Sequence, residues 1–299
     1  MAPPPIWSKQ MLDDISQSDA PGASLDLSRA DGAVEISVAW DGERTGLKHL
    51  FQSTPCRALF PAPGHGAPFE AVLVTTSGGV LGGDRLRFDL AAGPDSTSII
   101  TTQAAEKIYR STGPDSAITV AVHAQKNAAL EWMPQETILF DGARLRRRTT
   151  LEIASGSRVL TGEIIIFGRR ARGETFTKGL LHDAWRIERD GRLLWTDVLR
   201  LDGNIAEPIE RVHGFDGAAA IATLLYVAND APDRLEEARS LLSAISGCRT
   251  AATVVGPALV IRFLGRDPAA LRSAYARFWG EFRAFALGAP SRLPRVWET

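Results

Sequence analysis

Short runs in which apolar and polar residues alternate dominate the chain from Leu25 to Ile205. In the run Ala33–Trp40 the apolar residues stand at every second position, namely Val34, Ile36, Val38 and Trp40. This spacing is typical of a strand with one buried face. Further strand-like runs are Ser98–Thr102, Ala117–Ala124, Leu151–Ile153, Arg158–Phe167 and Trp185–Arg189. The pair Asp190-Gly191 lies between two such runs and predicts a hairpin turn, because Asp-Gly accommodates positive φ.

The last third of the chain changes to helical spacing. Residues 230–247 predict a helix with Asp230 as N-cap and Gly247 after its last turn. A second helix is predicted over Asp267–Gly288, and its apolar stripe consists of Leu271, Tyr275, Phe278, Trp279, Phe282 and Phe285. We expect this stripe either to pack on the sheet core or to dock a helical partner. Between the helices, Ala251–Leu264 is again strand-like.

These elements predict a mainly β protein with two α-helices near the C-terminus. No helix-length pattern separates consecutive strands before residue 215, which argues against a doubly wound nucleotide-binding fold. A sandwich, a barrel or a coil of strands fits the spacing. We expect residues 25–299 to form one β-rich domain. Residues 1–24 mix Pro, Ser, Asp and Gly, and we expect them to form a mobile N-terminal arm.

Composition narrows the range of partners and compartments. The formal net charge of -1 gives no reason to expect nucleic acid or an anionic membrane as partner. The two cysteines, Cys56 and Cys248, lie far apart and form neither a disulfide framework nor a zinc motif. No run reaches the roughly 18 apolar residues of a membrane span, and the N-terminus has no apolar signal core. We therefore expect a cytoplasmic protein.

Four polar or glycine-rich segments interrupt the strand-like runs, and we call them the four polar segments: Thr75–Leu86, Thr101–Ser111, Pro134–Ala143 and Thr161–Glu174. The first has four glycines but no P-loop lysine, and Asp84 would repel a phosphate. The nucleophile motif GxSxG is absent from the sequence, although a Ser-His-Asp site assembled in space stays open. Tight turns or close backbone approach explain the glycines equally well.

Metal chemistry depends on carboxylates here, because the five histidines are isolated in sequence. We predict no permanently bound metal or cofactor. The four polar segments contain six carboxylates, and three of them, Glu163, Asp84 and Asp141, are candidates for transient contact with a divalent cation. Glu163 opens an apolar run and should be partly buried, which is unfavourable unless it is paired. In one interpretation Glu163 forms a structural ion pair with Lys107, Arg110 or an arginine of residues 169–172. In the other, Glu163 is a weak ligand that lines a passage for a divalent cation.

Two basic clusters stand out against the near-neutral chain. They are Arg144 with residues 146–148, and Arg169 with Arg170 and Arg172. Solvated strand edges would use such charge to prevent edge-to-edge aggregation. An acidic protein surface is the alternative partner.

The order and the residues of the four polar segments resemble those of the UreD family, also called UreH, of urease accessory proteins. The resemblance is carried by Gly82-Gly83-Asp84, by residues 101–104 with 107–110, by residues 134–136 with 140–143, and by Gly162-Glu163 with Gly168-Arg169 and Gly173-Glu174. The tail Leu293–Trp297 is also similar. The match runs from about Leu47 to the end of the chain.

The resemblance implies a non-catalytic scaffold or metallochaperone whose strands wind in a helix-like coil. It further implies apo-urease subunits and UreF-type and UreG-type proteins as partners, with GTP hydrolysis on the UreG-type partner. Ni²⁺ would pass through the assembly into urease, and Glu163, Asp84 and Asp141 are the candidates for its transient path in this chain. Two alternatives remain from the residues alone: a β-fold hydrolase with an unrecognised site, or a ligand-binding β-domain.

Overall fold

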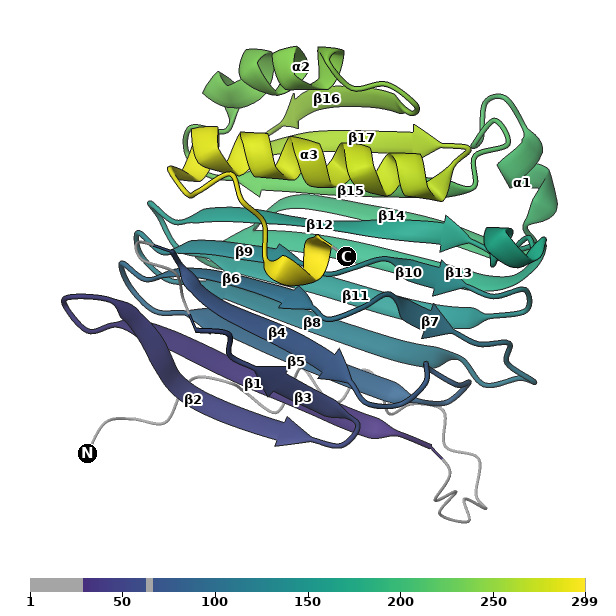
Figure 1. The fold of residues 1–299 in the computed structure, drawn as a ribbon, viewed down its shortest axis with the longest axis horizontal. Helices are drawn as coiled ribbons and strands as arrows, with labels where there is room; N and C mark the ends of the chain where they lie inside the picture. The colour runs from purple at the N-terminus through teal and green to yellow at the C-terminus, as the bar shows by residue number, and fades with distance from the viewer. Residues whose placement is uncertain (1–28, 63–66, 299) are drawn as a thin grey trace.

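The computed structural model describes residues 29–62 and 67–298. Within these residues the strands form a seven-stranded and a ten-stranded sheet, which lie one over the other (Figure 1). The N-terminal arm predicted for residues 1–24 lies outside the described residues.

The seven-stranded sheet is parallel except at its two edges. Its order is β14 (Arg192–Asn204), β13 (Lys178–Arg189), β11 (Arg144–Ile153), β8 (Ser116–Ala124), β5 (Arg85–Ala92), β1 (Asp31–Trp40) and β2 (Thr45–Ser53). The inner strands pair in parallel, whereas β14 and β2 each pair antiparallel with their neighbour.

The ten-stranded sheet has a parallel middle and antiparallel flanks. Its main order is β16 (Arg249–Val255), β17 (Ala258–Gly265), β15 (Ala220–Val227), β12 (Arg158–Phe167), β9 (Ala129–Met133), β6 (Thr97–Thr102), β4 (Phe69–Thr75) and β3 (Cys56–Leu59). The short strand β10 (Thr137–Leu139) pairs with both β12 and β7 (Glu106–Ile108). β12, β9, β6 and β4 are mutually parallel.

The chain crosses between the sheets repeatedly, and this crossing makes the fold a coil. From β4 onward it passes to β5, returns to β6, and continues in the same way through β8, β9, β11, β12 and β13. Strands of successive turns therefore pair in parallel within each sheet. The predicted mainly β fold with coiled strands is confirmed.

Apolar residues fill both faces of the ten-stranded sheet. One cluster lies between the sheets and includes Val34, Leu90, Val122, Leu151 and Phe167. The other lies between the ten-stranded sheet and the C-terminal helices, and it includes Leu224, Phe263, Phe278 and Trp279. Strand alternation explains the first cluster, because every second residue of β8 is buried. In the predicted strand β1, however, Trp40 is exposed.

Helix α3 (Pro268–Leu287) crosses the outer face of the ten-stranded sheet (Figure 1). The Asp267 side chain caps it by accepting a hydrogen bond from the Ala269 amide at 2.9 Å, and Gly288 ends it in the left-handed region. The predicted stripe is buried from Leu271 to Phe282, whereas Phe285 remains 41% exposed. The core-packing alternative is therefore confirmed for most of the stripe.

The turn at Asp190-Gly191 is confirmed, since both residues have positive φ and join β13 to β14. The predicted helix over residues 230–247 is too long: a 3-10 turn (Pro232–Arg234) precedes α2 (Leu235–Ser243). Asp230 does not cap the helix, because its carboxylate accepts from Tyr226 Oη and Arg234 instead. The run 251–264 is divided between β16 and β17 by the turn at Gly256. A further short helix, α1 (Ala206–Glu210), was not predicted.

Candidate functional site between the two sheets

The four polar segments lie beside one another in space. Val80 of the first segment bridges to Ile108 in β7 of the second. β7 pairs with β10 of the third, and β10 pairs with the end of β12 in the fourth. Segments that are about thirty residues apart in sequence thus form successive layers of the coil.

Two glycines in these segments allow close backbone approach. A Cβ at Gly162 would lie 2.1 Å from Tyr275 Oη and 2.5 Å from the Thr223 carbonyl oxygen. A Cβ at Gly82 would lie 2.2 Å from Ser111 Oγ. Real side chains do not tolerate such distances. The predicted close approach is therefore confirmed at Gly82, and Gly162 shows the same feature without having been predicted.

A cavity of about 50 Å³ lies between the sheets at this level. This volume is enough for a few water molecules or a small ion. Its polar lining consists of Thr102, Glu106, Gln135, Thr137, Arg147, Thr149 and Glu163, and its apolar walls include Phe88, Ile118, Val120, Trp132 and Trp185. Three of the four polar segments contribute to it.

A buried ionic group bridges the two sheets in this cavity. Arg147 of β11 donates from Nε and Nη2 to Asp183 of β13, at 2.9 and 2.7 Å. The same Nη2 donates to Glu163 of β12 in the opposite sheet, and Nη1 donates to Thr137 Oγ1 at 3.0 Å. Trp185 Nε1 donates to Glu163 Oε1 at 3.2 Å. The exposed fractions of Arg147, Glu163 and Asp183 are 7%, 6% and 1%.

The proton distribution in this group follows from burial and charge. Burial raises the pKa of Glu163 well above its ordinary value, and the Asp183 charge adds to that rise against the opposing effect of Arg147. Burial also acts to raise the pKa of Asp183, but the adjacent Arg147 guanidinium outweighs it and holds that pKa low. Asp183 is therefore the carboxyl that loses its proton at lower pH and pairs with Arg147 as a carboxylate, whereas Glu163 keeps its proton to higher pH.

A second carboxyl, Glu106 in β7, lines the same cavity. Its Oε2 accepts a hydrogen bond from Thr75 Oγ1 at 2.8 Å. Burial raises the pKa of Glu106, and the Thr75 hydrogen bond opposes that rise. Glu106 and Glu163 thus place two carboxyl groups with raised pKa on one internal cavity.

The structure separates the three carboxylates predicted for the Ni²⁺ path. Glu163 lines the cavity, whereas Asp84 and Asp141 do not. Asp84 accepts hydrogen bonds from the amides of Ala30 and Leu81, both at 2.8 Å. Asp141 Oδ1 accepts from the Thr177 amide and hydroxyl, both at 2.8 Å. Both residues therefore hold backbone turns in place.

The predicted ion-pair partners of Glu163 were wrong, because its cation is Arg147. The first basic cluster is also not at a strand edge, since β11 lies between β8 and β13. Strand alternation turns Arg146 and Arg148 to solvent and Arg147 inward. Sequence reasoning missed Arg147 and Asp183. The available signal was a charged residue in the same register as inward apolar residues.

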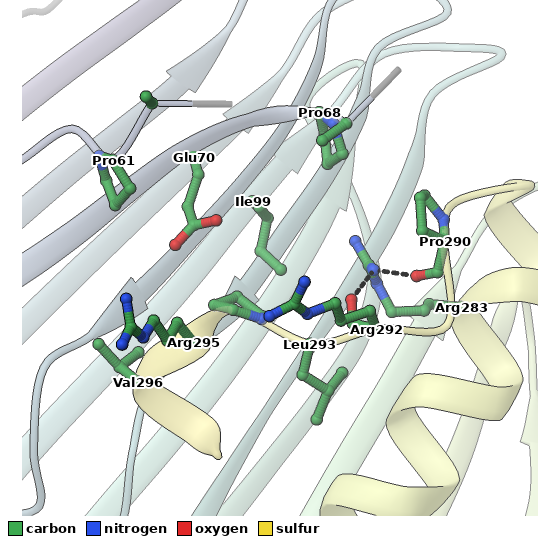
Figure 2. Close-up of a pocket in the computed structure, with 13 residues that line it drawn as sticks. Pro61, Pro68, Glu70, Ile99, Arg283, Pro290, Arg292, Leu293, Arg295 and Val296 are labelled. Atoms are coloured by element: carbon green, nitrogen blue, oxygen red, sulfur yellow. Dashed lines mark hydrogen bonds between the residues drawn. The ribbon is translucent and has the colours of Figure 1, made fainter. Parts of the chain in front are cut away.

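A larger cavity of about 760 Å³ opens on the surface beside the C-terminal tail (Figure 2). Its charged lining consists of Glu70 with Arg283, Arg292 and Arg295. Arg283 donates to the carbonyl oxygens of Pro290 and Arg292 and so ties the tail to α3 (Figure 2). An excess of arginine disfavours a cation at this place.

Two of the four polar segments also anchor that tail. Trp297 Nε1 donates to Thr101 Oγ1 at 2.9 Å, and Gln135 Nε2 donates to the Val296 carbonyl oxygen at 2.8 Å. The tail and the segments that carry the resemblance therefore form one connected structure around the ten-stranded sheet.

Oxygen atoms are the potential metal ligands of the cavity between the sheets. Within residues 29–62 and 67–298, no group of three or more His, Cys, Asp and Glu side chains is arranged to hold a metal ion. Carboxylate and hydroxyl oxygens without imidazole or thiolate hold a late transition metal weakly. The arrangement suits brief contact with a divalent cation. No helix in the described part of the chain is long and apolar enough to cross a membrane.

Fold and site together define a coil of β-strands with a polar cavity between its sheets and helices on one outer face. The family model described as UreD urease accessory protein matches residues 30–298. The chain therefore belongs to the UreD family of urease accessory proteins.

Relatives match over most of their length. A urease accessory protein UreD of Magnetococcus marinus is 42% identical over 271 residues, which are 89% of this chain and 93% of the relative. Urease accessory protein UreD 1 of Methylobacterium radiotolerans is 42% identical, over 93% of this chain and 95% of its own. Urease accessory protein UreD 2 of Methylorubrum populi is 38% identical over 98% of both chains.

Proposed function

We propose that this chain acts in urease maturation as a non-catalytic scaffold through which Ni²⁺ passes into apo-urease. It would work in the cytoplasm in a complex with UreF-type and UreG-type proteins, and the UreG-type partner would hydrolyse GTP. Membership of the UreD family supports the maturation role. The internal cavity with Glu163 and Glu106 is the observation that supports passage of the cation.

The cavity has the chemistry that a transit site needs. Its ligands are carboxyl and hydroxyl oxygens, which bind Ni²⁺ less tightly than imidazole or thiolate does. Weak binding favours release to a urease site of higher affinity. Among the three predicted carboxylates, only Glu163 lines the cavity, and Glu106 joins it there. We propose these two as the carboxyl groups on the path.

Co-expression tests the maturation role. Urease subunits and the other accessory proteins are produced with and without this chain, and urease nickel content and urea hydrolysis are measured. We expect both to depend on the chain, and on its recovery in a complex with the UreF-type protein. Urease that is fully nickel-loaded without the chain would contradict the proposal.

A nucleotide assay tests the non-catalytic role separately. The purified chain alone should show no steady hydrolysis of GTP or ATP. Hydrolysis that is abolished by Asp84→Asn would contradict this part of the proposal, because Asp84 would then act in turnover rather than in a backbone turn.

A further inference from the structure

Arg147 places a cation inside the proposed cation path. Its guanidinium lies between the sheets and contacts Glu163, Asp183 and Thr137. These contacts are with two carboxyl groups and a hydroxyl, which are oxygen ligands that a divalent cation also accepts. The guanidinium therefore already contacts the oxygen atoms that an ion in this cavity would need as ligands.

The contacts of Arg147 are unequal on its two sides. Arg147 and Asp183 are register partners on the neighbouring strands β11 and β13. Asp183 receives two hydrogen bonds from the guanidinium, in a bidentate pair, whereas Glu163 in the opposite sheet receives one. Bidentate pairs are the stronger and more specific kind. Glu163 is therefore the carboxyl that Arg147 can release while it stays paired within its own sheet.

We infer that Arg147 is a tethered competitor for the transported cation, and that a divalent cation binds Glu163 only by displacing this guanidinium. This inference rests on the proposed function, and it adds that Arg147 controls how tightly the cavity holds the cation. Two positive charges repel strongly in a poorly hydrated interior, so bound Ni²⁺ and the returning guanidinium oppose each other. The competition keeps the site weak and promotes release of the ion.

Arg283 provides a matched control. It is also a buried arginine, and it pairs with Glu131, which accepts a further hydrogen bond from Trp279 Nε1 at 2.7 Å. Glu163 has the same kinds of partner in Arg147 and Trp185. The Arg283 pair does not line the cavity between the sheets. A general effect of breaking a buried ion pair would therefore appear at both sites, and a competition effect only at Arg147.

Equilibrium dialysis of the purified full chain against Ni²⁺ tests the inference. Arg147→Met should bind Ni²⁺ about tenfold more tightly than wild type, because the competitor is gone. The double variant Arg147→Met with Glu163→Gln should lose that gain. Arg283→Met should bind like wild type. Unchanged affinity in Arg147→Met, or an equal gain in Arg283→Met, would overturn the inference.

Arg147→Lys keeps the experiment decisive if Arg147→Met fails to fold. Lysine retains the charge but cannot make the planar bidentate pair with Asp183. We therefore expect the Arg147→Lys chain to bind Ni²⁺ about threefold more tightly than wild type. A folded Arg147→Lys chain with wild-type affinity would overturn the inference. Dialysis needs no urease, so a failed competition effect is distinguishable from a failed maturation role.

Discussion

Two effects act in opposite directions on the pKa of Glu163. Burial disfavours the charged carboxylate, whereas the nearby Arg147 guanidinium favours it. Burial has the larger effect and raises the pKa of Glu163. Arg147 remains paired with ionised Asp183 on its own sheet. Glutamine is close in shape to a protonated glutamic acid, so Glu163→Gln should leave no orphaned charge. Loss of function in this variant would then not require loss of the fold.

The pH dependence of stability tests the assignment of the proton to Glu163. A carboxyl whose pKa is raised by folding stabilises the protein fully below its unfolded pKa, near 4.5. That contribution disappears as pH rises through the folded pKa. The free energy of unfolding of wild type relative to Glu163→Gln should therefore decrease as pH rises from the unfolded pKa through the raised folded pKa. Urea unfolding followed by tryptophan fluorescence measures it.

Asp183 is present in both proteins, and its pKa is lowered by folding. Its contribution to the free energy of unfolding therefore increases with pH, and it does so in a lower pH range. The part of its contribution that comes from Arg147 cancels in the comparison, because Arg147 is present in both proteins. A difference between wild type and Glu163→Gln that does not change with pH would show that folding leaves the pKa of Glu163 unperturbed.

At the scale of elements, the turn between β12 and β13 is fixed by two glycines with different surroundings. Gly168 has φ of +90°, and a Cβ there would lie 2.4 Å from the Glu174 carbonyl oxygen. Gly173 has φ of +71°, and nothing lies within 4 Å of an added Cβ. The two positions separate backbone strain from steric conflict.

Gly173→Ala should lower the free energy of unfolding by about 1–2 kcal/mol, through left-handed strain alone. Gly168→Ala should lower it more, because the methyl group also meets backbone atoms that cannot move freely. Urea unfolding of both variants compares them. Equal losses would mean that the backbone near Glu174 yields easily.

The helix α3 is attached to the ten-stranded sheet by its aromatic face. Phe282 is buried and packs against Tyr226 and Phe278, with ring centroids at 5.5 and 5.3 Å. Phe282→Ala should therefore lower the free energy of unfolding by about 3–5 kcal/mol.

Phe285 on the next turn is 41% exposed and is the matched control. Phe285→Ala should have a much smaller effect on unfolding, measured in the same urea series. If Phe282→Ala were as stable as wild type, the stripe would not be core, and loss of binding to the UreF-type protein would move it to an interface.

At the scale of the whole molecule, local pattern predicted the elements better than their contacts. The apolar stripe of α3 and the alternation of the strands are short-range features, so the sequence contained them. The pairing of Glu163 with Arg147 joins strands in opposite sheets, and the spacing of residues within one strand does not determine which side chains meet across the core.

Charge clusters were the least informative part of the sequence. Adjacent arginines in β11 face opposite sides of a sheet, so residues 146–148 are not one basic patch. The glycine-rich segment Thr75–Leu86 likewise supplies no carboxylate to the cavity. It holds Asp84 in a backbone turn, and Thr75, which precedes the glycines, supports Glu106.

The nickel content of urease is the most direct test of the cation path. Urease and the other accessory proteins are co-expressed with wild type, Glu163→Gln or Glu131→Gln. Glu131 is also a buried carboxylate paired with an arginine and a tryptophan, but it lies outside the cavity. Breaking its ion pair should destabilise the chain by about 3–5 kcal/mol.

Nickel is compared at equal amounts of recovered complex. The cation path predicts that Glu163→Gln folds and joins the complex, yet lowers urease nickel content severalfold. Glu131→Gln should deliver nickel normally per folded chain. A stable Glu163→Gln chain that loads urease to the wild-type level would contradict the path.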